Sequence, residues 1–369
     1  MKSVPSAILR RSLSKDGKSR SLVSDCDQDT LCEAKQYLSA KSIRNAAERT
    51  FYEKQLQIET LVSYGSGFIL GALYLLHLLG FTTASMFFDM HYQVSGTEYV
   101  YNKGLKDFYY FSFLFLSLLF FRSTFALRFG RNLAVSLGIK RFKTINRFTE
   151  QFYGMVMAAV SFVFGIYLYL KFPQFLRLDT AWTSYPIIEM PQLIKFYYLY
   201  QAAFWSTALF YIFIEQRRSD FLAMLVHHIV TISLIAGSYL FNYSAIGIII
   251  HVTMDFVDIF LPLAKLFKYL NYTTATNVAF AFMAISWVVT RHIIFLRIII
   301  NIAFESLGYI QFNYDPLNGV YATPNIQNVF TLFLVILQIL CYVWLYSIVL
   351  IIIDAVNGKV LDDVRSEEE

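Results

Sequence analysis

Two adjacent histidines and two aspartates are the residues of this 369-residue chain whose types and spacing best suit catalysis. His227 and His228 lie in one apolar stretch, and Asp255 and Asp258 lie in the next one along the chain. A histidine near a carboxylate acts as a general base, or as a nucleophile whose tautomer the carboxylate fixes. No serine or cysteine beside the pair forms a nucleophile motif, so the histidines are the candidates for the chemistry.

Helical spacing gathers further polar groups around these four residues. His251, Asp255 and Asp258 follow the spacing i, i+4, i+7, which places them in one polar stripe on a helix. Thr231 comes one helical turn after the histidine pair and on the same side of its helix. We therefore expect Thr231 and His251 to contact a substrate beside the catalytic groups.

The short turn at 242–244 makes the two apolar stretches antiparallel neighbours and fixes the relative depth of their polar groups. His228 comes 14 residues before Asn242, and Asp258 comes 14 residues after Ser244. At a rise of about 1.5 Å per residue, both lie about 20 Å from the turn. The sequence thus predicts a site where the histidines and a carboxylate meet at one level. If these apolar stretches cross a membrane, as argued below, that level lies near its cytosolic boundary. We expect Asp258 to orient one of the histidines.

Several arginines are candidates for substrate contacts or for charge neutralisation. Arg291 lies inside an apolar stretch, where it would neutralise an aspartate or attract an anionic group, and Arg297 has the same two interpretations. A structural ion pair, or a side chain that snorkels to the interface, is the alternative for both. Arg217 and Arg218 precede the histidine stretch and would hold phosphates. The alternative for Arg217 and Arg218 is that their positive charges only keep this loop on the cytosolic side of the membrane.

Two other interpretations of the histidines stay open at this point. A membrane histidine is often only a hydrogen-bonded packing residue. Histidine and aspartate also ligate zinc or iron. Membrane hydroxylases, however, carry more histidines than the six present here, in HxxxH and HxxHH boxes that this sequence lacks. We therefore predict no metal site and no resident cofactor.

The amino-acid composition indicates that the chain is a membrane protein. Hydrophobic residues make up 57% and charged residues 15%, against about 25% charged in soluble domains. These values exclude an ordinary soluble enzyme, a disordered protein and a disulfide scaffold, and nothing indicates a nucleic-acid partner. A membrane span needs about 20 mainly apolar residues. The sequence predicts an all-α, polytopic membrane helix bundle of about eight transmembrane helices, at 61–80, 108–127, 152–170, 196–214, 222–241, 245–264, 277–300 and 328–353.

Lysine and arginine residues predict the orientation of this bundle. With the N-terminus in the cytosol, the cytosolic segments hold 23 Lys and Arg residues and the lumenal segments hold 5. The positive-inside rule therefore places both termini in the cytosol. Ser14 and Ser366 stand in sequence contexts typical of kinase substrates, and unmodified solvated tails are the alternative.

The motif around the histidines resembles the longevity-assurance motif of ceramide synthases, sphingoid-base N-acyltransferases of the TLC-domain superfamily. The resemblance covers Arg217 to Phe221, His227 to Thr231, Asn242 with Tyr243, Met254 to Asp258 and Ala264 to Leu270. A histidine pair followed by Asp-x-x-Asp is specific, and Met before the first aspartate is typical of the fungal branch. The looser similarity extends over most of 60–355.

The resemblance implies transfer of a fatty acyl group from acyl-CoA to the amine of a sphingoid base. It makes His227 and His228 the catalytic histidines, and Asp255 and Asp258 the motif aspartates. It also implies the endoplasmic reticulum membrane and a small single-span partner subunit, with a homo- or hetero-oligomer as a further possibility. Because acyl-CoA is a substrate, no cofactor is implied. A non-catalytic TLC-domain lipid sensor or translocon-associated protein is the rival interpretation.

These expectations divide the chain into four parts. Residues 1–60 form a cytosolic N-terminal tail, and residues 61–146 hold the first two transmembrane helices with a basic cytosolic loop that contacts lipid head groups. Residues 147–355 form a TLC-like catalytic helix bundle. Residues 356–369 form an acidic cytosolic tail.

Overall fold

The computed structural model describes residues 28–173 and 177–357, without the side chains of residues 28–45 and 179. Ser14 and Ser366 lie outside this part of the chain. The chain divides into two compact units, Met1–Lys54 and Gln55–Glu369. The described part of the first unit is the beginning of helix α2 (Gln28–Leu78), which continues without a break into the second unit. The second unit carries all of the candidate site residues.

The second unit is a bundle of long helices, as the sequence predicts. Within the described residues, seven helical segments are long and apolar enough to cross a membrane. Each of the eight predicted spans overlaps a helix, and the predictions at 61–80, 196–214 and 222–241 extend one to three residues beyond its C-terminal end. Two of the segments each join two helices: α4 (Asp107–Thr124) with α5 (Arg131–Ser136), and α11 (Thr273–Trp287) with α12 (Phe295–Ala303). The other five each lie in one helix, namely α2, α6 (Phe142–Lys171), α9 (Phe221–Leu240), α10 (Ser244–Tyr269) and α13 (Pro324–Val356).

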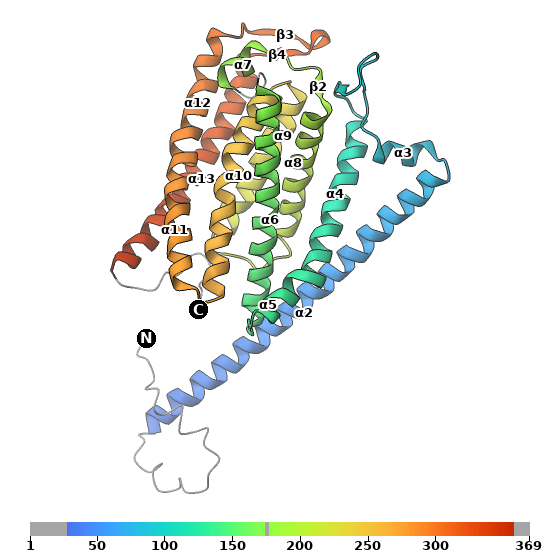
Figure 1. Cartoon of the computed structure of the whole chain (residues 1–369). Helices are drawn as coiled ribbons and strands as arrows, with labels where there is room; N and C mark the ends of the chain where they lie inside the picture. Colours follow the sequence, from blue (N-terminus) through green and yellow to red (C-terminus); the bar gives the residue numbers. More distant parts are fainter. Residues whose placement is uncertain (1–27, 174–176, 358–369) are drawn as a thin grey trace. The chain divides into compact units, whose positions relative to one another are not determined.

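The predicted span at 196–214 forms helix α8 (Gln192–Tyr211), which is not among those seven segments. Its 20 residues include Lys195, Gln201 and several tyrosines, which lower its hydropathy. Helix α8 nevertheless runs through the bundle beside α9 (Figure 1). Several of its polar side chains are buried, Lys195 and Gln201 among them, because they face other helices. These buried polar groups matter for the site described below.

Short elements gather at one end of the bundle, which we call the hairpin end (Figure 1). They include α7 (Leu178–Thr183), an antiparallel pair of β1 (Val100–Tyr101) with β2 (Met190–Pro191), and an antiparallel pair of β3 (Asn313–Asp315) with β4 (Val320–Ala322). The sequence predicts no strands, and these are too short for an alternating pattern to show. The remaining short elements are α3 (Thr82–Phe88), η4 (Glu305–Gly308) and η5 (Pro316–Asn318).

The turn between α9 and α10 lies at the hairpin end and is as tight as predicted. Asn242 adopts a left-handed backbone conformation with φ of 67°, which asparagine tolerates better than most residues. Its side-chain amide donates a hydrogen bond of 2.7 Å to the carbonyl of Gly319, next to β4. The two helices that carry the histidines and the aspartates are therefore antiparallel neighbours, and the turn between them is fixed to the hairpin.

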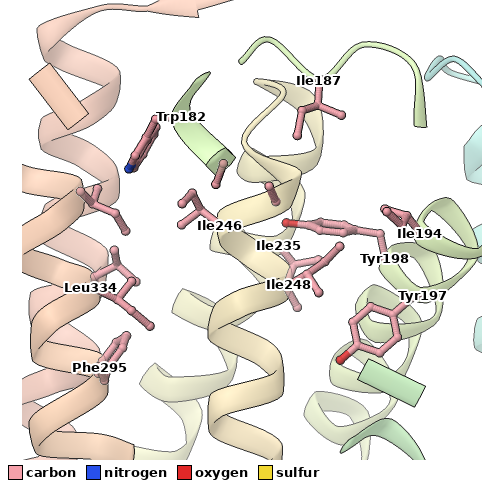
Figure 2. Close-up of a cluster of buried hydrophobic side chains, with 14 of the residues drawn as sticks. Trp182, Ile187, Ile194, Tyr197, Tyr198, Ile235, Ile246, Ile248, Phe295 and Leu334 are labelled. Carbon is pink, nitrogen blue, oxygen red and sulfur yellow. The ribbon is translucent and has the colours of Figure 1, made fainter. Parts of the chain in front are cut away.

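The main core cluster surrounds helix α10. Figure 2 shows Tyr197 and Tyr198 of α8 on one side of this helix, and Phe295 and Leu334 on the other side. Gly247 lets α10 approach α8 closely, because a Cβ atom there would collide with the Tyr198 hydroxyl. A π-helical segment, η1 (Phe125–Gly130), joins α4 to α5. A second one, η3 (Val288–Ile294), joins α11 to α12 within the predicted span at 277–300. Such segments are frequent at functional sites, and this one carries Arg291.

Candidate active site

A cavity of about 360 Å³ runs through the bundle and contains the predicted catalytic residues. Helices α8, α9, α10 and α13, together with η3 and α12, contribute to its wall, which is mostly apolar. Seven of the nine predicted site residues line this one cavity: His227, His228, Thr231, His251, Asp255, Asp258 and Arg291. The structure therefore brings together the two polar groups that the depth argument placed at one level.

His227 is held by aromatic packing rather than by hydrogen bonds. Its ring centroid lies 5.3 Å from Trp205, 5.5 Å from His228 and 5.6 Å from Trp344, with each ring nearly perpendicular to it. Edge-to-face contacts of this kind fix the orientation of a ring. Its two nitrogens have no hydrogen-bond partner among the described residues, so they are free to react with a ligand.

His228 has a fixed tautomer. Its Nδ1 atom lies 2.6 Å from the carbonyl oxygen of Met224, one turn earlier in α9, and only an N–H can donate to that oxygen. Nε2 then carries the lone pair, which accepts a proton or attacks a carbonyl carbon. His228 is buried, and its ring also packs edge-on against Trp205. A backbone carbonyl thus performs the orienting role that we expected of an aspartate.

Asp255 is buried and receives two hydrogen bonds from helix α8. The side-chain amide of Gln201 donates to Oδ2 at 3.0 Å, and the Tyr197 hydroxyl donates to the same oxygen at 3.4 Å. The Gln201 amide also lies 3.0 Å from the Tyr197 hydroxyl. A buried carboxyl group needs such donors, because an unpaired one would be strongly disfavoured. Helix α8 therefore fixes this carboxyl group at the cavity wall.

Asp258 pairs with Arg291 and not with a histidine, so the expectation that it orients a histidine is wrong. Arg291 Nη2 lies 2.7 Å from Asp258 Oδ1 and 3.0 Å from the carbonyl oxygen of Met254. The Arg291 guanidinium also lies over the Trp287 ring, 5.4 Å from its centroid. Arg291 reaches the aspartate from the π-helical segment, which confirms the predicted neutralisation of a motif carboxylate by this arginine.

The other arginines lie outside the cavity wall. Arg297 forms an ion pair with Glu305 at 2.7 Å, which matches the structural alternative for this residue. Arg218 lies 3.6 Å from Glu150. The Arg217 guanidinium stacks over the Phe221 ring, 4.7 Å from its centroid. The structure does not bring Arg217 and Arg218 to the histidine pair, so their contact with substrate phosphates stays a prediction.

Thr231 and His251 line the cavity toward the hairpin end from the histidine pair. Thr231 is 8% exposed, and its hydroxyl has no hydrogen-bond partner among the described residues. His251 is 7% exposed and packs edge-on against Tyr197 and Tyr198, with ring centroids 6.4 Å apart in both cases. In the described part of the chain, no group of three or more His, Cys, Asp or Glu residues is arranged to hold a metal ion.

Four residues at the site were not predicted from the sequence: Trp205, Trp344, Tyr197 and Gln201. Gln201 and Tyr197 carried a detectable signal, because they are polar residues spaced i, i+4 in a predicted span. Trp344 carried none, since it lies in the last helix, more than 100 residues from the histidines. Its indole N–H donates to Asp220 at 3.2 Å, just before α9, and this bond places its ring against His227.

Comparison with known proteins identifies the family of the chain. The TLC domain family matches residues 147–350. A sphingosine N-acyltransferase of Schizosaccharomyces pombe is 32% identical over 272 residues, which cover 73% of this chain and 69% of that protein. A ceramide synthase of Saccharomyces cerevisiae is 32% identical over 294 residues, 77% of this chain and 69% of its own length. A ceramide synthase of Caenorhabditis elegans is 32% identical over 231 residues, 62% of this chain and 70% of its own length. The chain belongs to the ceramide synthase family of TLC-domain membrane proteins, on its fungal branch, and is a sphingosine N-acyltransferase.

Proposed function

We propose that the histidine pair transfers a fatty acyl group from acyl-CoA to the amine of a sphingoid base through an acyl-imidazole on His227. The observation that carries this proposal is the difference between the two histidines. Within the described residues His227 has no hydrogen-bonded nitrogen, whereas His228 donates Nδ1–H to Met224 and keeps a lone pair on Nε2. One ring is free to act as the nucleophile while the neighbouring ring acts as a base.

The reaction proceeds in two balanced steps. A His227 nitrogen attacks the thioester carbon, the carbon–sulfur bond breaks, and the CoA thiolate leaves and takes up the proton that the acylated His227 ring loses from its other nitrogen. The ammonium of the sphingoid base loses one proton to Nε2 of His228, and the free amine attacks the acyl-imidazole. The bond to His227 breaks, and the leaving His227 nitrogen takes up the second proton that the amine loses. A thioester is already activated, so neither step needs ATP or a metal ion. Direct attack of the amine on the thioester is the alternative order, with the histidines as the base.

The motif carboxyl groups act on the second substrate. A sphingoid base carries an ammonium group near neutral pH, and negative charge at the cavity wall attracts it. Asp255 and Asp258 line the same cavity as His228, which removes a proton before the amine attacks. Arg291 pairs with Asp258 and thereby limits the cost of placing two carboxyl groups close together.

The cellular setting follows from the same proposal. We place the protein in the endoplasmic reticulum membrane with both termini in the cytosol, where acyl-CoA is delivered. The hairpin end of the bundle then faces the lumen. We also propose that the protein binds a small single-span subunit and forms an oligomer, and that its outer helix faces contact membrane lipids.

Purified protein in lipid nanodiscs, given acyl-CoA and sphinganine, tests the proposal. We expect ceramide and free CoA from the wild-type chain, and a loss of about 10²-fold or more after His227→Ala or His228→Ala. His77→Ala is the matched control, because His77 lies outside the cavity wall and hydrogen-bonds Ser85. Undiminished product after both site changes would contradict the proposal. Inactivity of the wild type with its partner subunit would favour the non-catalytic rival.

A further inference from the structure

Two hydrogen-bond donors beside the histidine pair are buried without a partner in the described part of the chain. They are the indole N–H of Trp205 and the hydroxyl of Thr231. Both residues line the cavity. A buried donor without an acceptor costs about 1–3 kcal/mol. Such groups are retained at functional sites when the missing acceptor belongs to a ligand.

The free hydroxyl of Thr231 is unusual among those of the neighbouring helices. The hydroxyls of Ser233, Ser238 and Thr253 each donate to the carbonyl oxygen four residues earlier, at 2.7–2.8 Å. The corresponding bond of Thr231, to the carbonyl of His227, is not made. Side chains on a helix point back toward its N-terminus, so the Thr231 side chain leans over the turn that carries His227.

Trp205 is the tryptophan that contacts both histidines, with ring centroids 5.3 Å from His227 and 5.6 Å from His228. The indole N–H groups of Trp182 and Trp344 have side-chain acceptors, whereas that of Trp205 has none in the described chain. Trp287 also lacks an acceptor there, but its ring contacts Trp344 instead of the histidines. Among the free donors of the described cavity wall, Trp205 contacts both histidines, and Thr231 lies one helical turn after them in α9.

We propose that the Trp205 indole N–H and the Thr231 hydroxyl form the oxyanion hole for the acyl group. The inference rests on the proposed function, because it assumes that the thioester carbonyl carbon reacts at the histidine pair. Attack on that carbon turns its carbonyl oxygen into an oxyanion, and both donors bind this oxygen. When the tetrahedral intermediate collapses, the carbon–oxygen double bond returns and the thiolate leaves. The same two donors serve the second intermediate, which forms when the amine attacks.

Thr231→Val removes the hydroxyl and preserves the shape of the side chain. Removal of one oxyanion donor lowers kcat by about 10²- to 10³-fold, and we expect a loss in this range with the KM for acyl-CoA little changed. Thr231→Ser restores the hydroxyl and most of the rate. Thr253→Val is the matched control, since its hydroxyl is bound to its own helix and it lies outside the cavity wall. We expect wild-type kcat for this control.

Trp205 needs a change that removes only the N–H. Benzothienylalanine at position 205 keeps the size of the ring and replaces N–H with sulfur, whereas Trp205→Phe also weakens the packing against both histidines. We expect a fall in kcat of about 10²-fold for the sulfur analogue. Its melting temperature should match that of the wild type, because the wild-type indole N–H has no partner in the described residues.

Rapid mixing with acyl-CoA, in the absence of a sphingoid base, separates this inference from the proposed function. We expect a burst of free thiol from the wild type, a slower burst from Thr231→Val and none from His227→Ala. Thr231→Val with a kcat within about twofold of the wild type, or Thr231→Ser as slow as Thr231→Val, would overturn the oxyanion hole. A His227→Ala protein that keeps the burst would overturn the proposed function instead, whatever happens at Thr231.

Discussion

Two polar clusters inside the bundle differ in how far their groups are satisfied. The lysine cluster, toward the hairpin end, consists of Asp107, Lys195, Tyr239 and Lys103. Lys195 and Asp107 are 0% and 4% exposed and form an ion pair of 2.7 Å. Tyr239 donates to the other oxygen of Asp107 at 2.8 Å, and Lys195 also donates to two backbone carbonyls at 2.7 Å. Beside the histidine pair, by contrast, Thr231 and Trp205 keep free donors.

The difference distinguishes buried polar residues that stabilise the fold of a membrane protein from those that bind its ligand. A charge in the lysine cluster has its acceptors within the protein, so its desolvation cost is offset in the folded state. Its bonds join α4, α8 and α9 to the loop before α4. The active site leaves donors and a histidine open at a cost in stability, which a ligand recovers when it binds. The same substitution in the two clusters should therefore change different properties.

Asp107→Asn should cause the largest loss of stability. It leaves the Lys195 ammonium buried without a counter-charge, and breaking a buried ion pair in this way costs about 3–5 kcal/mol. Thermal unfolding in detergent measures the effect as a lower Tm. The double change Asp107→Asn with Lys195→Met removes the stranded charge and should recover part of the loss. A single variant as stable as the wild type would show that the lysine cluster is not structural.

Asp255→Asn applies the same substitution to the active site, where we expect little change in Tm. The asparagine oxygen still accepts from Gln201 and Tyr197, so the contact with α8 survives. The loss of negative charge should raise the KM for the sphingoid base about ten- to a hundredfold, because a charge-assisted hydrogen bond contributes about 1.5–3 kcal/mol. The KM for acyl-CoA should stay near its wild-type value. Equal changes in both KM values would argue against contact between Asp255 and the ammonium.

The sequence was sufficient for the part of the site that depends on one helix or on one tight turn. The i, i+4, i+7 stripe and the turn at 242–244 correctly placed His251, Asp255 and Asp258 in one cavity with the histidines. Both inferences use only helical periodicity and rise, which the chain fixes locally.

The partners of those residues could not be predicted, because they depend on how distant helices pack. Arg291 reaches Asp258 from a π-helical segment, and no sequence pattern marks that segment in advance. His228 bonds to the carbonyl oxygen of Met224 in its own helix and not to an aspartate, and helical spacing alone does not decide between these acceptors. The predicted span at 196–214 begins just after Lys195 and leaves it among the lumenal residues, whereas the structure places it in α8, where Asp107 makes its burial possible.

At neutral pH Lys103 gives the smallest expected effect, and its pH dependence tests whether every member of the lysine cluster is satisfied. This residue lies before α4, outside the spanning segments, and donates to the carbonyl of Tyr239 at 3.1 Å and to Ser244 at 3.4 Å. Burial, and then the charge of Lys195, lower its pKa from 10.5 to about 7, against a smaller opposing effect of Asp107. Between these two values the unfolded chain binds more protons at this position than the folded chain does.

The contribution of Lys103 to stability should therefore rise as the pH increases from about 7 to about 10, by at most about 1.4 kcal/mol per pH unit. Below pH 7 the lysine is charged in both states, and its contribution is constant at its lowest value. Lys103→Met removes this titration, so its Tm between pH 7 and pH 9 should increase less than that of the wild type. Parallel Tm profiles for the two proteins would mean that Lys103 is as well satisfied as Lys195, and that the lysine cluster holds its charges without strain.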